Sequence, residues 1–521
     1  MQVGRPTFDL PDDVLEFPSV IHALDYAGTE VPDRTALVCG ENSIDYAGYR
    51  RAVGGMAVMI GELCMQGDRA AVLMTNSIDM AVALMGAMAA GAQTAPLNPA
   101  LTDRELKPLL IDVDPSIIIC DAGTEERARG LAAELGIANV LSAASDFDIW
   151  AWAADENNRL PEPLPEPDSR AAMFFTGGTT GVPKAAEHTH HSLSVYAPLI
   201  HAVWTFRFDA ETILNVAPMF HVWGHQFTLV FPLYLRATMV IVPQYSPKLV
   251  LAELARNRVT VFAGGPAAIF LGLLAADTID DTDLSALEYS IAGGSACPEG
   301  LLSRWQTRTG NEILEGWGMS EGAPINSNPT HGIKKRLSTG ITSPRTEIDI
   351  VDLETGTRVL PQGEKGEIRL RGPQFTIGYR NKPEETAAAI RNGWLYTGDI
   401  GYFDEDGYMF LVDRKKEMII VGGFNVYPRE IDEVLTNHPA VAEAAAVGAP
   451  DDFSGEVVRA FVALAPGGET DVEALMAYCA ENLVRYKQPK SIEILDELPK
   501  KGPGKIDKMT LKIRAEETTF P

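Results

Sequence analysis

Short apolar runs alternate with helix-length amphipathic stretches between about residue 20 and residue 340. The first clear pair is Arg69–Thr75, which has the pattern of a strand, and Ser77–Ala90, which has the pattern of the helix after it. Further strand-like runs are Ser116–Cys120, Ala171–Phe175, Thr212–Val216, Thr238–Val242 and Arg258–Phe262. Continuous β-branched runs separated by helices are typical of parallel sheets that are covered on both faces. The pattern therefore predicts an α/β fold with doubly wound, mostly parallel sheets.

After residue 340 the pattern changes to short strands separated by Gly, Pro and Asp turns. These strands are expected at Glu347–Val351, Gly366–Arg371 and Gly407–Val412, and they predict a β-rich subdomain that completes the large domain. The last 105 residues, beyond Lys416, have the pattern of a small α+β domain. Its strands are expected at Val441–Val447 and Val457–Leu464, and its helices near Pro428–Asn437 and Asp471–Leu483.

A chain of 521 residues is too long for a single hydrophobic core. We expect a large N-terminal domain over residues 1–412 and a mobile C-terminal domain over residues 417–521. Charged residues at 413–416, followed closely by the pair Gly422 and Gly423, predict a hinge between them and a second backbone-lined binding surface.

Composition narrows the class of protein further. A net charge of −27 argues against nucleic acid or an anionic membrane as a general partner, because both would repel the surface. The five cysteines are scattered without a C-x-x-C pair, which indicates neither a zinc cluster nor a disulfide framework and fits a reducing compartment. No signal peptide is evident, and the longest apolar run, Met80–Ala92, is too short to span a bilayer. These features predict a cytoplasmic protein with no transmembrane segment.

The densest candidate for chemistry is the run TGGTTGVPK at Thr176–Lys184, directly after a predicted strand. Glycines let backbone N–H groups approach phosphate oxygens, hydroxyls donate further hydrogen bonds, and a lysine adds positive charge. The nucleotide loop G-x-x-x-x-G-K-[ST] does not match, because only two residues separate Gly178 from Gly181 and Val182-Pro183 precede the lysine. The run predicts a phosphate loop of another kind, and a flexible surface loop is the alternative.

Two other glycine-rich segments carry candidate ligands. In EGWGMSE, Glu315–Glu321, an aromatic ring and a carboxylate share one tight loop, so Trp317 could stack on a purine or border an apolar pocket and Glu321 could hold Mg²⁺. The segment AGGSACP, Ala292–Pro298, predicts a further strand end with close backbone approach, although such a segment alone is commonly only a turn.

Later in the chain, single charged residues occupy short loops. Asp399 in YTGDI is suited to vicinal ribose hydroxyls, and an Asx turn is an equally good interpretation without context. Lys505 ends the loop PKKGPGK, which would ordinarily be solvated but is short and rigid enough to deliver one cation to a distant site.

Taken together, these motifs resemble those of the adenylate-forming superfamily of acyl-CoA synthetases, standalone adenylation domains and luciferases. The resemblance extends from about residue 20 to residue 513, and the motifs occur in the family order. By this resemblance, the phosphate loop would hold the β- and γ-phosphates of ATP. Its ligand residues would be Thr176, Gly177, Gly178, Thr179, Thr180, Gly181 and Lys184.

The resemblance also implies roles around the nucleotide. Asp399 would bind the ribose, and Arg414 would contact ribose or phosphate. Ser320 and Glu321 would contact the adenylate and Mg²⁺. Trp317, where the family usually has tyrosine, would lie beside adenine and the acyl group. Gly293 and Gly294 would form the wall on the adenine side.

Further roles concern the acid, the thiol and the movement between them. His221, in PMFHVWG, matches the family histidine beside the carboxylate, although alone it would more often be a packed core histidine. Lys505 matches the lysine required for adenylation, and Lys416 matches the hinge. Gly422 and Gly423 would line a channel for the phosphopantetheine arm of coenzyme A.

The implied reaction joins a carboxylic acid to AMP with release of pyrophosphate, and then transfers the acyl group to a thiol. Only 16 residues follow Lys505, so we expect free coenzyme A rather than a fused carrier domain as acceptor. A standalone enzyme that loads a separate carrier protein is the alternative. Luciferase-type oxidation and a catalytically silent sensor are more remote. The acid is expected to be apolar, fatty or aryl, and the oligomeric state stays open, although dimers are frequent in the superfamily.

Overall fold

The computed structural model describes residue 10 and residues 14–176, 183–451, 453–500 and 506–517. The chain forms two compact units. The first comprises Met1–Glu347 and Arg371–Trp394, and the second comprises Ile348–Leu370 and Leu395–Pro521. The predicted β-rich subdomain therefore groups largely with the C-terminal segment in the second unit, whereas the domain boundary at the 413–416 hinge stays a prediction.

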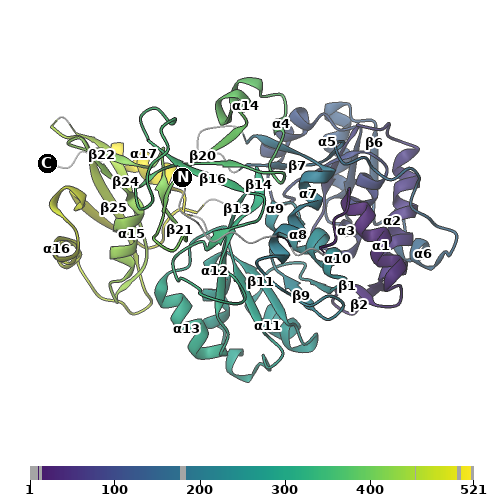
Figure 1. Cartoon of the computed structure of the whole chain (residues 1–521), viewed down its shortest axis with the longest axis horizontal. Coiled ribbons are helices and arrows are strands. Elements are labelled where there is room, and N and C mark those ends of the chain that lie inside the picture. The colour runs from purple at the N-terminus through teal and green to yellow at the C-terminus, as the bar shows by residue number, and fades with distance from the viewer. Residues whose placement is uncertain (1–9, 11–13, 177–182, 452, 501–505, 518–521) are drawn as a thin grey trace. The chain divides into compact units, whose positions relative to one another are not determined.

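One sheet of the first unit has seven strands in the order β18-β8-β7-β4-β3-β5-β6. Two of its strands, β6 and β7, are labelled in Figure 1. The five strands from β7 to β6 are parallel, and β8 and β18 add an antiparallel edge on the other side. The strands are β3 (Arg69–Leu73), β4 (Gln93–Pro96), β5 (Ile117–Cys120), β6 (Asn139–Ser142), β7 (Arg170–Phe175), β8 (Ala185–Thr189) and β18 (Gly378–Tyr379).

The other sheet of this unit has nine strands in the order β15-β14-β13-β12-β11-β9-β10-β1-β2. The six strands from β13 to β1 are parallel, and the edges are antiparallel. The strands are β1 (Thr35–Cys39), β2 (Asn42–Asp45), β9 (Thr212–Asn215), β10 (Thr238–Ile241), β11 (Val261–Gly265), β12 (Tyr289–Ala292), β13 (Ile313–Met319), β14 (Gly322–Ser327) and β15 (Ile341–Thr342). In the seven-stranded sheet, β4 follows β3 on one side, and β5 and β6 are then added on the other. In the nine-stranded sheet, β10 follows β9 on one side, and β11, β12 and β13 are then added on the other. This is the doubly wound arrangement, which forms ligand sites at the carboxyl ends of the strands.

Helices separate the strands of the first unit, and polar residues begin many of them. Ser77 caps α3 by accepting a hydrogen bond from the backbone N–H of Met80, 3.0 Å away. The helices are α1 (Val20–Glu30), α2 (Tyr46–Gly61), α3 (Ile78–Ala89), α4 (Asp103–Val113), α5 (Glu125–Leu135), α6 (Ile149–Ala154), α7 (His190–Ser194), α8 (Tyr196–His201), α9 (Val222–His225), α10 (Phe231–Leu235), α11 (Pro247–Arg256), α12 (Ala267–Leu274), α13 (Glu299–Thr309) and α14 (Pro383–Ala389). A π-helical turn, η1 (Gln226–Val230), joins α9 to α10, a 3₁₀ turn, η2 (Ile279–Asp281), follows α12, and a short strand, β19 (Ile390–Arg391), follows α14.

Alternate residues along the strands belong to different hydrophobic cores, which explains the continuous apolar runs. In the nine-stranded sheet, Ile213 belongs to the core shared with the seven-stranded sheet and with α1, α2, α3 and α10. Its neighbour Leu214 belongs to a separate core with α11, α12 and α13. In the seven-stranded sheet, Ile117 faces the shared core and Ile118 faces α4 and α5. Each sheet is therefore covered by helices on both faces.

The second unit contains two smaller sheets. In the first, β16 (Glu347–Val351), β17 (Gly366–Arg371), β20 (Trp394–Phe403) and β21 (Met409–Arg414) lie side by side. In the second, β24 and β25 form a long antiparallel pair, and β26 joins β25 in parallel. The strands of this sheet are β22 (Ile419–Val421), β23 (Phe424–Val426), β24 (Val441–Asp451), β25 (Gly455–Leu464) and β26 (Ser491–Leu495).

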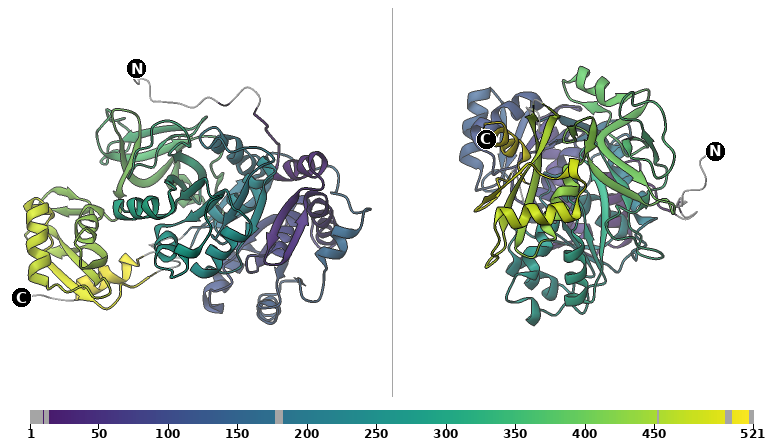
Figure 2. Two further views of the ribbon diagram at one scale, coloured as in Figure 1. Left: turned by 90° about the horizontal axis from the view of Figure 1, so that it is seen from below. Right: turned by 90° about the vertical axis from the view of Figure 1, so that its left-hand side faces the viewer.

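Helices cover this second sheet on both faces (Figure 2). Helices α15 (Pro428–Thr436) and α16 (Val472–Asn482) pack on one face, and α17 (Lys508–Glu517) packs on the other. A 3₁₀ turn, η3 (Arg485–Lys487), precedes β26. The C-terminal part is thus the α+β arrangement that the sequence pattern predicts.

The predicted fold class is confirmed, although β21 begins two residues later than predicted and one other strand is displaced further. The apolar run Arg258–Phe262 suggests a strand three residues too early, because β11 begins only at Val261. Arg258 adopts a positive φ of 48°, and the N–H of Val259 donates to the carbonyl of Leu254, so these residues close α11. Among the described residues, no helix is long and apolar enough to cross a membrane.

Candidate functional site

Parallel pairing brings the carboxyl ends of β11, β12 and β13 together at one edge of the nine-stranded sheet. The N–H of Gly293 donates to the carbonyl of Gly265, 3.0 Å away, and a β-carbon on Gly293 would lie 3.0 Å from the carbonyl oxygen of Gly316. Gly294 follows with a φ of +79° and open space around its β position. The structure thus places the predicted glycine wall beside the strand that carries Trp317.

His221 and Trp223 lie at the start of α9. His221 is exposed, and its Nδ1 accepts the backbone N–H of Trp223 at 3.2 Å, which makes the histidine the N-cap of the helix. The Trp223 indole lies against the glycine wall, because a β-carbon on Gly293 would fall 2.3 Å from its Cζ3. It also contacts Phe227, with 4.6 Å between ring centroids. The start of α9 therefore carries an exposed histidine and, two residues later, a large apolar side chain.

The predicted phosphate loop connects β7 to β8. Its two ends are held together, because the N–H of Thr176 donates to the carbonyl of Lys184 at 2.8 Å. The remaining predicted phosphate ligands lie outside the described residues; these are Gly177, Gly178, Thr179, Thr180 and Gly181. The Lys184 ammonium lies 5.1 Å from the centroid of the Tyr379 ring. One cation is thus fixed at the end of the loop.

Ser320 and Glu321 form the turn between β13 and β14, and two neighbouring strands hold them. The Glu321 carboxylate is 8% exposed and accepts a hydrogen bond from the Tyr379 hydroxyl at 2.6 Å. Nε2 of His188, on β8, lies 2.9 Å from the carbonyl oxygen of Ser320. Burial lowers the pKa of His188 to about 4, against a smaller opposing effect of the Ser320 carbonyl, so the ring is neutral at pH 7 and Nε2–H is the donor.

Glu321 is suited to Mg²⁺ bound mainly by nucleotide phosphates. Among the described residues, no group of three or more His, Cys, Asp or Glu side chains could form a protein-only metal site. Mg²⁺ is usually held by one or two carboxylates together with substrate phosphates and water. A single carboxylate in the same unit as a phosphate loop fits that requirement.

The second unit carries the predicted ribose-binding residues on adjacent strands. Asp399 on β20 pairs in register with Arg414 on β21, and the arginine Nε lies 3.3 Å from the aspartate Oδ1. The aspartate side chain is 12% exposed, whereas the arginine side chain is 51% exposed. The ion pair therefore holds a mostly buried carboxylate next to an accessible guanidinium.

The predicted hinge and thiol-channel residues lie further along the same unit. Lys416 is in the turn after β21, where the N–H of Glu417 donates to the carbonyl of Arg414 at 2.9 Å. Gly422 and Gly423 form the turn between β22 and β23, with φ values of +57° and +87°. Two consecutive residues with positive φ explain the glycine pair, because other residues rarely adopt this conformation. Lys505, the predicted adenylation lysine, lies outside the described residues.

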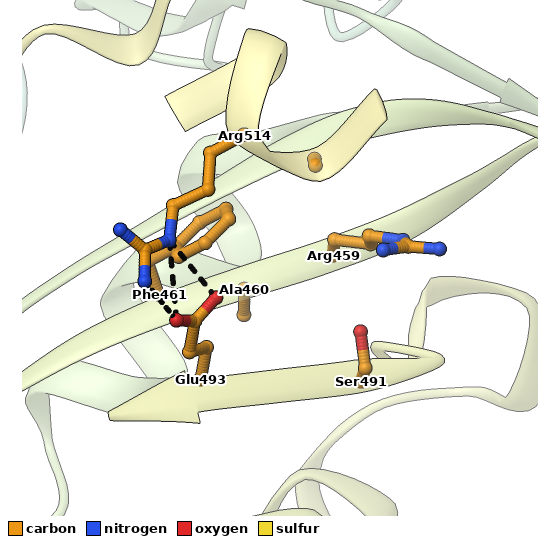
Figure 3. A pocket seen from close by; sticks show the side chains of 7 residues that line it. Arg459, Ala460, Phe461, Ser491, Glu493 and Arg514 are labelled. Carbon is orange, nitrogen blue, oxygen red and sulfur yellow. Dashed lines mark hydrogen bonds and ion pairs between the residues drawn. The ribbon is translucent and has the colours of Figure 1, made fainter. Parts of the chain in front are cut away.

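A small cavity elsewhere in the second unit is lined by β25, β26 and α17 (Figure 3). The Nε of Arg514 lies 3.1 Å from Oε1 of Glu493, and Arg459 and Ser491 complete the lining on the opposite side. Because the only carboxylate in this lining is already paired with a guanidinium, the cavity offers no open cation site.

Comparison with known proteins shows the family. The model of the AMP-binding enzymes matches residues 24–380, and the model of the AMP-binding enzyme C-terminal domain matches residues 430–505. The chain belongs to the AMP-binding enzyme family. The predicted membership of the adenylate-forming superfamily is therefore confirmed, and ATP is its nucleotide substrate.

Relatives of this AMP-binding enzyme differ in the acid that their names give. A long-chain-fatty-acid–CoA ligase of Bacillus subtilis is 34% identical over 487 residues, covering 87% of this chain and 86% of the relative. A feruloyl-CoA synthase of an Amycolatopsis species is 35% identical over 486 residues, covering 93% and 96%. Among solved structures, ATP-bound MatB from Rhodopseudomonas palustris is 28% identical with a TM-score of 0.88, covering 95% and 99%.

Sequence reasoning missed two residues of this AMP-binding enzyme that touch the predicted site. Tyr379 and His188 contact Glu321 and Ser320, from which they are separated by 58 and 132 positions in the sequence. The one signal is Gly378 before the tyrosine, because its φ of +139° and the Thr386 methyl group 2.7 Å from its β position favour glycine there. The predicted roles of the site residues themselves stay predictions.

Proposed function

We propose that this protein is an ATP-dependent carboxylic acid–CoA ligase, with the acyl-adenylate as intermediate. Two findings together support this function. Both AMP-binding models match the chain, and relatives that are similar over at least 86% of their own length are named CoA ligases or synthases. The acid has an apolar tail, fatty or aryl, because the wall of Gly265, Gly293 and Trp223 offers no charged partner.

In the first half-reaction, a carboxylate oxygen attacks the α-phosphorus of ATP and the bond to pyrophosphate breaks. Two anions must approach each other, so cations and N–H donors have to be in place before the reaction. Lys184 and the phosphate-loop amides would hold the β- and γ-phosphates, and Lys505 would meet the charge that develops at the α-phosphate. Mg²⁺, held by Glu321 and the phosphates, would neutralise part of this charge. His221 would orient the carboxylate.

In the second half-reaction, the sulfur of coenzyme A attacks the acyl carbon and AMP leaves. AMP is a far better leaving group than the oxide of a free carboxylate, and this difference is why ATP is consumed. Lys505 has no part in this step, so the C-terminal segment would turn about Lys416 and bring Gly422 and Gly423 to the thiol channel. Asp399 and Arg414 would keep the nucleotide bound through both steps. A cytoplasmic location and a homodimer stay predictions.

The test measures AMP release from ATP and Mg²⁺ with a panel of straight-chain, branched and aryl acids, with and without coenzyme A. We expect coenzyme A-dependent AMP release with one class of acid. Lys505→Ala should abolish it, whereas Lys512→Ala, which removes a lysine from α17, should not. Acid-dependent pyrophosphate exchange without turnover on coenzyme A would favour the carrier-loading alternative, and silence in both assays would favour a sensor.

A further inference from the structure

Tyr379 contacts both the carboxylate of Glu321, which we assign to Mg²⁺, and the ammonium of Lys184, which we assign to the ATP phosphates. Its hydroxyl donates a hydrogen bond to Oε1 of Glu321 at 2.6 Å. A phenol hydroxyl that faces a carboxylate is the donor of the pair, so the tyrosine holds the Glu321 side chain through this bond.

The ring of the same tyrosine contacts Lys184. The lysine Nζ lies 5.1 Å from the ring centroid, within the range of a cation–π interaction. Lys184 immediately precedes β8, and Glu321 follows β13 of the other sheet. One side chain thus contacts a cation at the end of the phosphate loop and a carboxylate from a different sheet.

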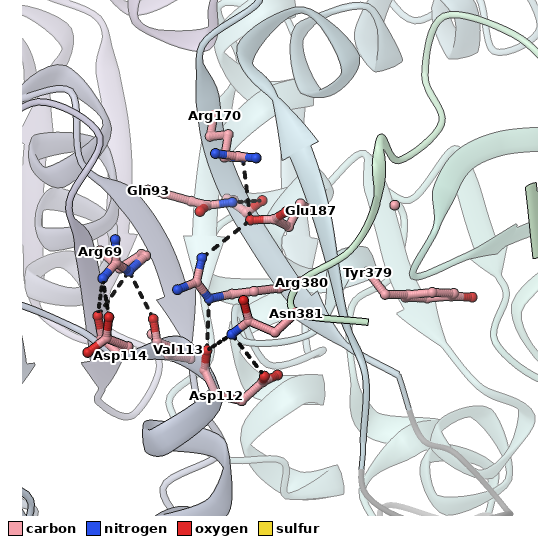
Figure 4. A network of polar contacts seen from close by, with 12 residues as sticks. Arg69, Gln93, Asp112, Val113, Asp114, Arg170, Glu187, Tyr379, Arg380 and Asn381 are labelled. Atoms are coloured by element: carbon pink, nitrogen blue, oxygen red, sulfur yellow. Dashed lines mark hydrogen bonds and ion pairs between the residues drawn. The ribbon is translucent and has the colours of Figure 1, made fainter. Parts of the chain in front are cut away.

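The backbone around Tyr379 is fixed on several sides. Strand β18 pairs with β8, with Tyr379 opposite Ala186, and the tyrosine N–H donates to Oγ1 of Thr386 at 2.9 Å. Beyond it, Nε of Arg380 donates to the carbonyl of Asp112 at 2.8 Å, and Asn381 contacts the same carbonyl (Figure 4). The backbone on which the ring is mounted is therefore anchored by β8, α14 and α4, separately from the side chains of Glu321 and Lys184.

The Glu321 backbone is held by the same segment. The N–H of Thr376 donates to the carbonyl oxygen of Glu321 at 2.7 Å. Segment 376–381 consequently fixes both the main chain and the carboxylate of Glu321. Such double support is expected where the orientation of a side chain has functional consequences.

We propose that Tyr379 is a positioning residue, which orients the Glu321 carboxylate toward Mg²⁺ while its ring places the Lys184 ammonium beside the phosphates. This inference rests on the proposed roles of Glu321 and Lys184. The physical reason is geometric: Mg²⁺ demands near-ideal octahedral coordination, and a carboxylate that rotates away offers it a poorer ligand. Because Glu321 is the only protein carboxylate that we assign to the ion, no second assigned carboxylate would compensate if Glu321 were misoriented.

The test is a binding measurement that needs no turnover. ATP binding to the full-length protein is measured by calorimetry without acid or coenzyme A, once with EDTA and once across a Mg²⁺ titration. Tyr379→Phe removes the hydrogen bond and keeps the ring. We expect it to reduce the gain in ATP affinity from Mg²⁺ about tenfold, as for a lost hydrogen bond to a charged group, and to leave binding in EDTA unchanged.

Two further variants separate the ring from the hydroxyl and a specific effect from a general one. Tyr379→Leu also removes the ring, so ATP binding should weaken in EDTA as well, because Lys184 loses its contact. Tyr245→Phe is the matched control, since it removes another partly buried tyrosine hydroxyl, which donates to the carbonyl of Ile269 at 3.0 Å. This control should change neither titration.

A double variant makes the result decisive. In a Glu321→Gln background, Tyr379→Phe should have no further effect on the Mg²⁺ dependence. The inference is overturned if Tyr379→Phe matches the wild type, weakens binding equally with and without Mg²⁺, or keeps its effect in that background. If the Glu321→Gln protein retains the full Mg²⁺ response, the proposed role of Glu321 is itself wrong and the inference falls with it.

Discussion

The indole of Trp223 occupies the space that a side chain on Gly293 would need. A β-carbon at Gly293 would lie 2.3 Å from Cζ3 and 2.8 Å from Cη2 of that indole, which is closer than non-bonded carbon atoms approach. The two residues come from different elements, α9 and the end of β12, and Gly293 cannot take a side chain unless the indole moves. Both residues belong to the proposed walls of the acyl and adenine pockets. A shift of α9, which carries Trp223, would therefore change the shape of these pockets.

Gly293→Ala should therefore displace the indole and disturb acid recognition. We expect kcat/KM for the acid to fall about tenfold to a hundredfold, the range typical of a small misplacement of substrate-positioning groups. Trp223→Phe, which has a smaller ring, should restore part of this loss when both changes are combined. Steady-state kinetics with the best acid of the panel gives the result.

The control for this pair is Gly300→Ala on α13, where a β-carbon meets no atom within 4 Å. Its kinetics should equal those of the wild type. If the effects of Gly293→Ala and Trp223→Phe on kcat/KM are strictly additive, the contact between the two residues does not affect acid recognition.

A different prediction concerns the ribose. If Asp399 accepts hydrogen bonds from both ribose hydroxyls, the enzyme should prefer ATP to 2′-deoxy-ATP, and Asp399→Asn should reduce this preference. We expect the KM for ATP to rise about tenfold, while the KM for 2′-deoxy-ATP changes less. Asp406→Asn, in the turn before β21, is a control that should keep the preference. If the Asp399→Asn enzyme prefers ATP to 2′-deoxy-ATP as strongly as the wild type does, Asp399 does not bind the ribose and its role is structural, as in the ion pair with Arg414.

The sequence predicts the large architecture well, because the relevant signal is local. Continuous apolar runs such as Ser116–Cys120 arise since alternate residues face two different cores, and helices separate the runs. The antiparallel edges β14 and β18 are not foreseen. Strand β18 is two residues long, and its partner β8 lies almost two hundred positions away, so no periodic pattern marks it.

Site prediction has the same limit. Glycine-rich loops and charged residues beside them are visible in the sequence, which is why Gly293 and Asp399 could be named as candidates. Tyr379 is not found, because its hydrogen bond to Glu321 depends on how two sheets meet and not on spacing along the chain. His188 is missed for the same reason, since its contact with the Ser320 carbonyl spans 132 positions.

Buried histidines predict acid sensitivity of the first unit. Burial lowers the pKa of His188 to about 4 and that of His225 to about 3, and both rings lie edge-on to Phe174. Between the ordinary pKa of 6.5 and these values, the unfolded chain binds more protons than the folded one. The free energy of unfolding should therefore fall as pH falls, by about 1.4 kcal/mol per pH unit for each histidine, and level off near pH 4 and pH 3.

Denaturant unfolding from pH 7 to pH 4.5, followed by a probe in the first unit, measures this slope. His225→Leu replaces one titrating side chain by an apolar one of similar size. The slope should therefore become shallower by roughly 1.4 kcal/mol per pH unit. His331→Leu, at an exposed position, is the control and should keep the wild-type slope. An unchanged slope in the His225→Leu protein would contradict the proposed origin of the acid sensitivity.

The last prediction concerns the turn that contains Lys416. If the C-terminal segment must turn there between the half-reactions, fixing one backbone angle should favour one arrangement over the other. Lys416→Pro fixes φ near −65° and restricts Lys415 before it. We expect the two half-reactions, measured as pyrophosphate exchange and as acyl transfer from preformed adenylate to coenzyme A, to change unequally, by about tenfold or more relative to each other. Lys416→Ala keeps the backbone free and should affect both steps to the same small extent. Equal losses in both steps of the Lys416→Pro enzyme would mean that the substitution only damages the fold, and that the turn is not the hinge.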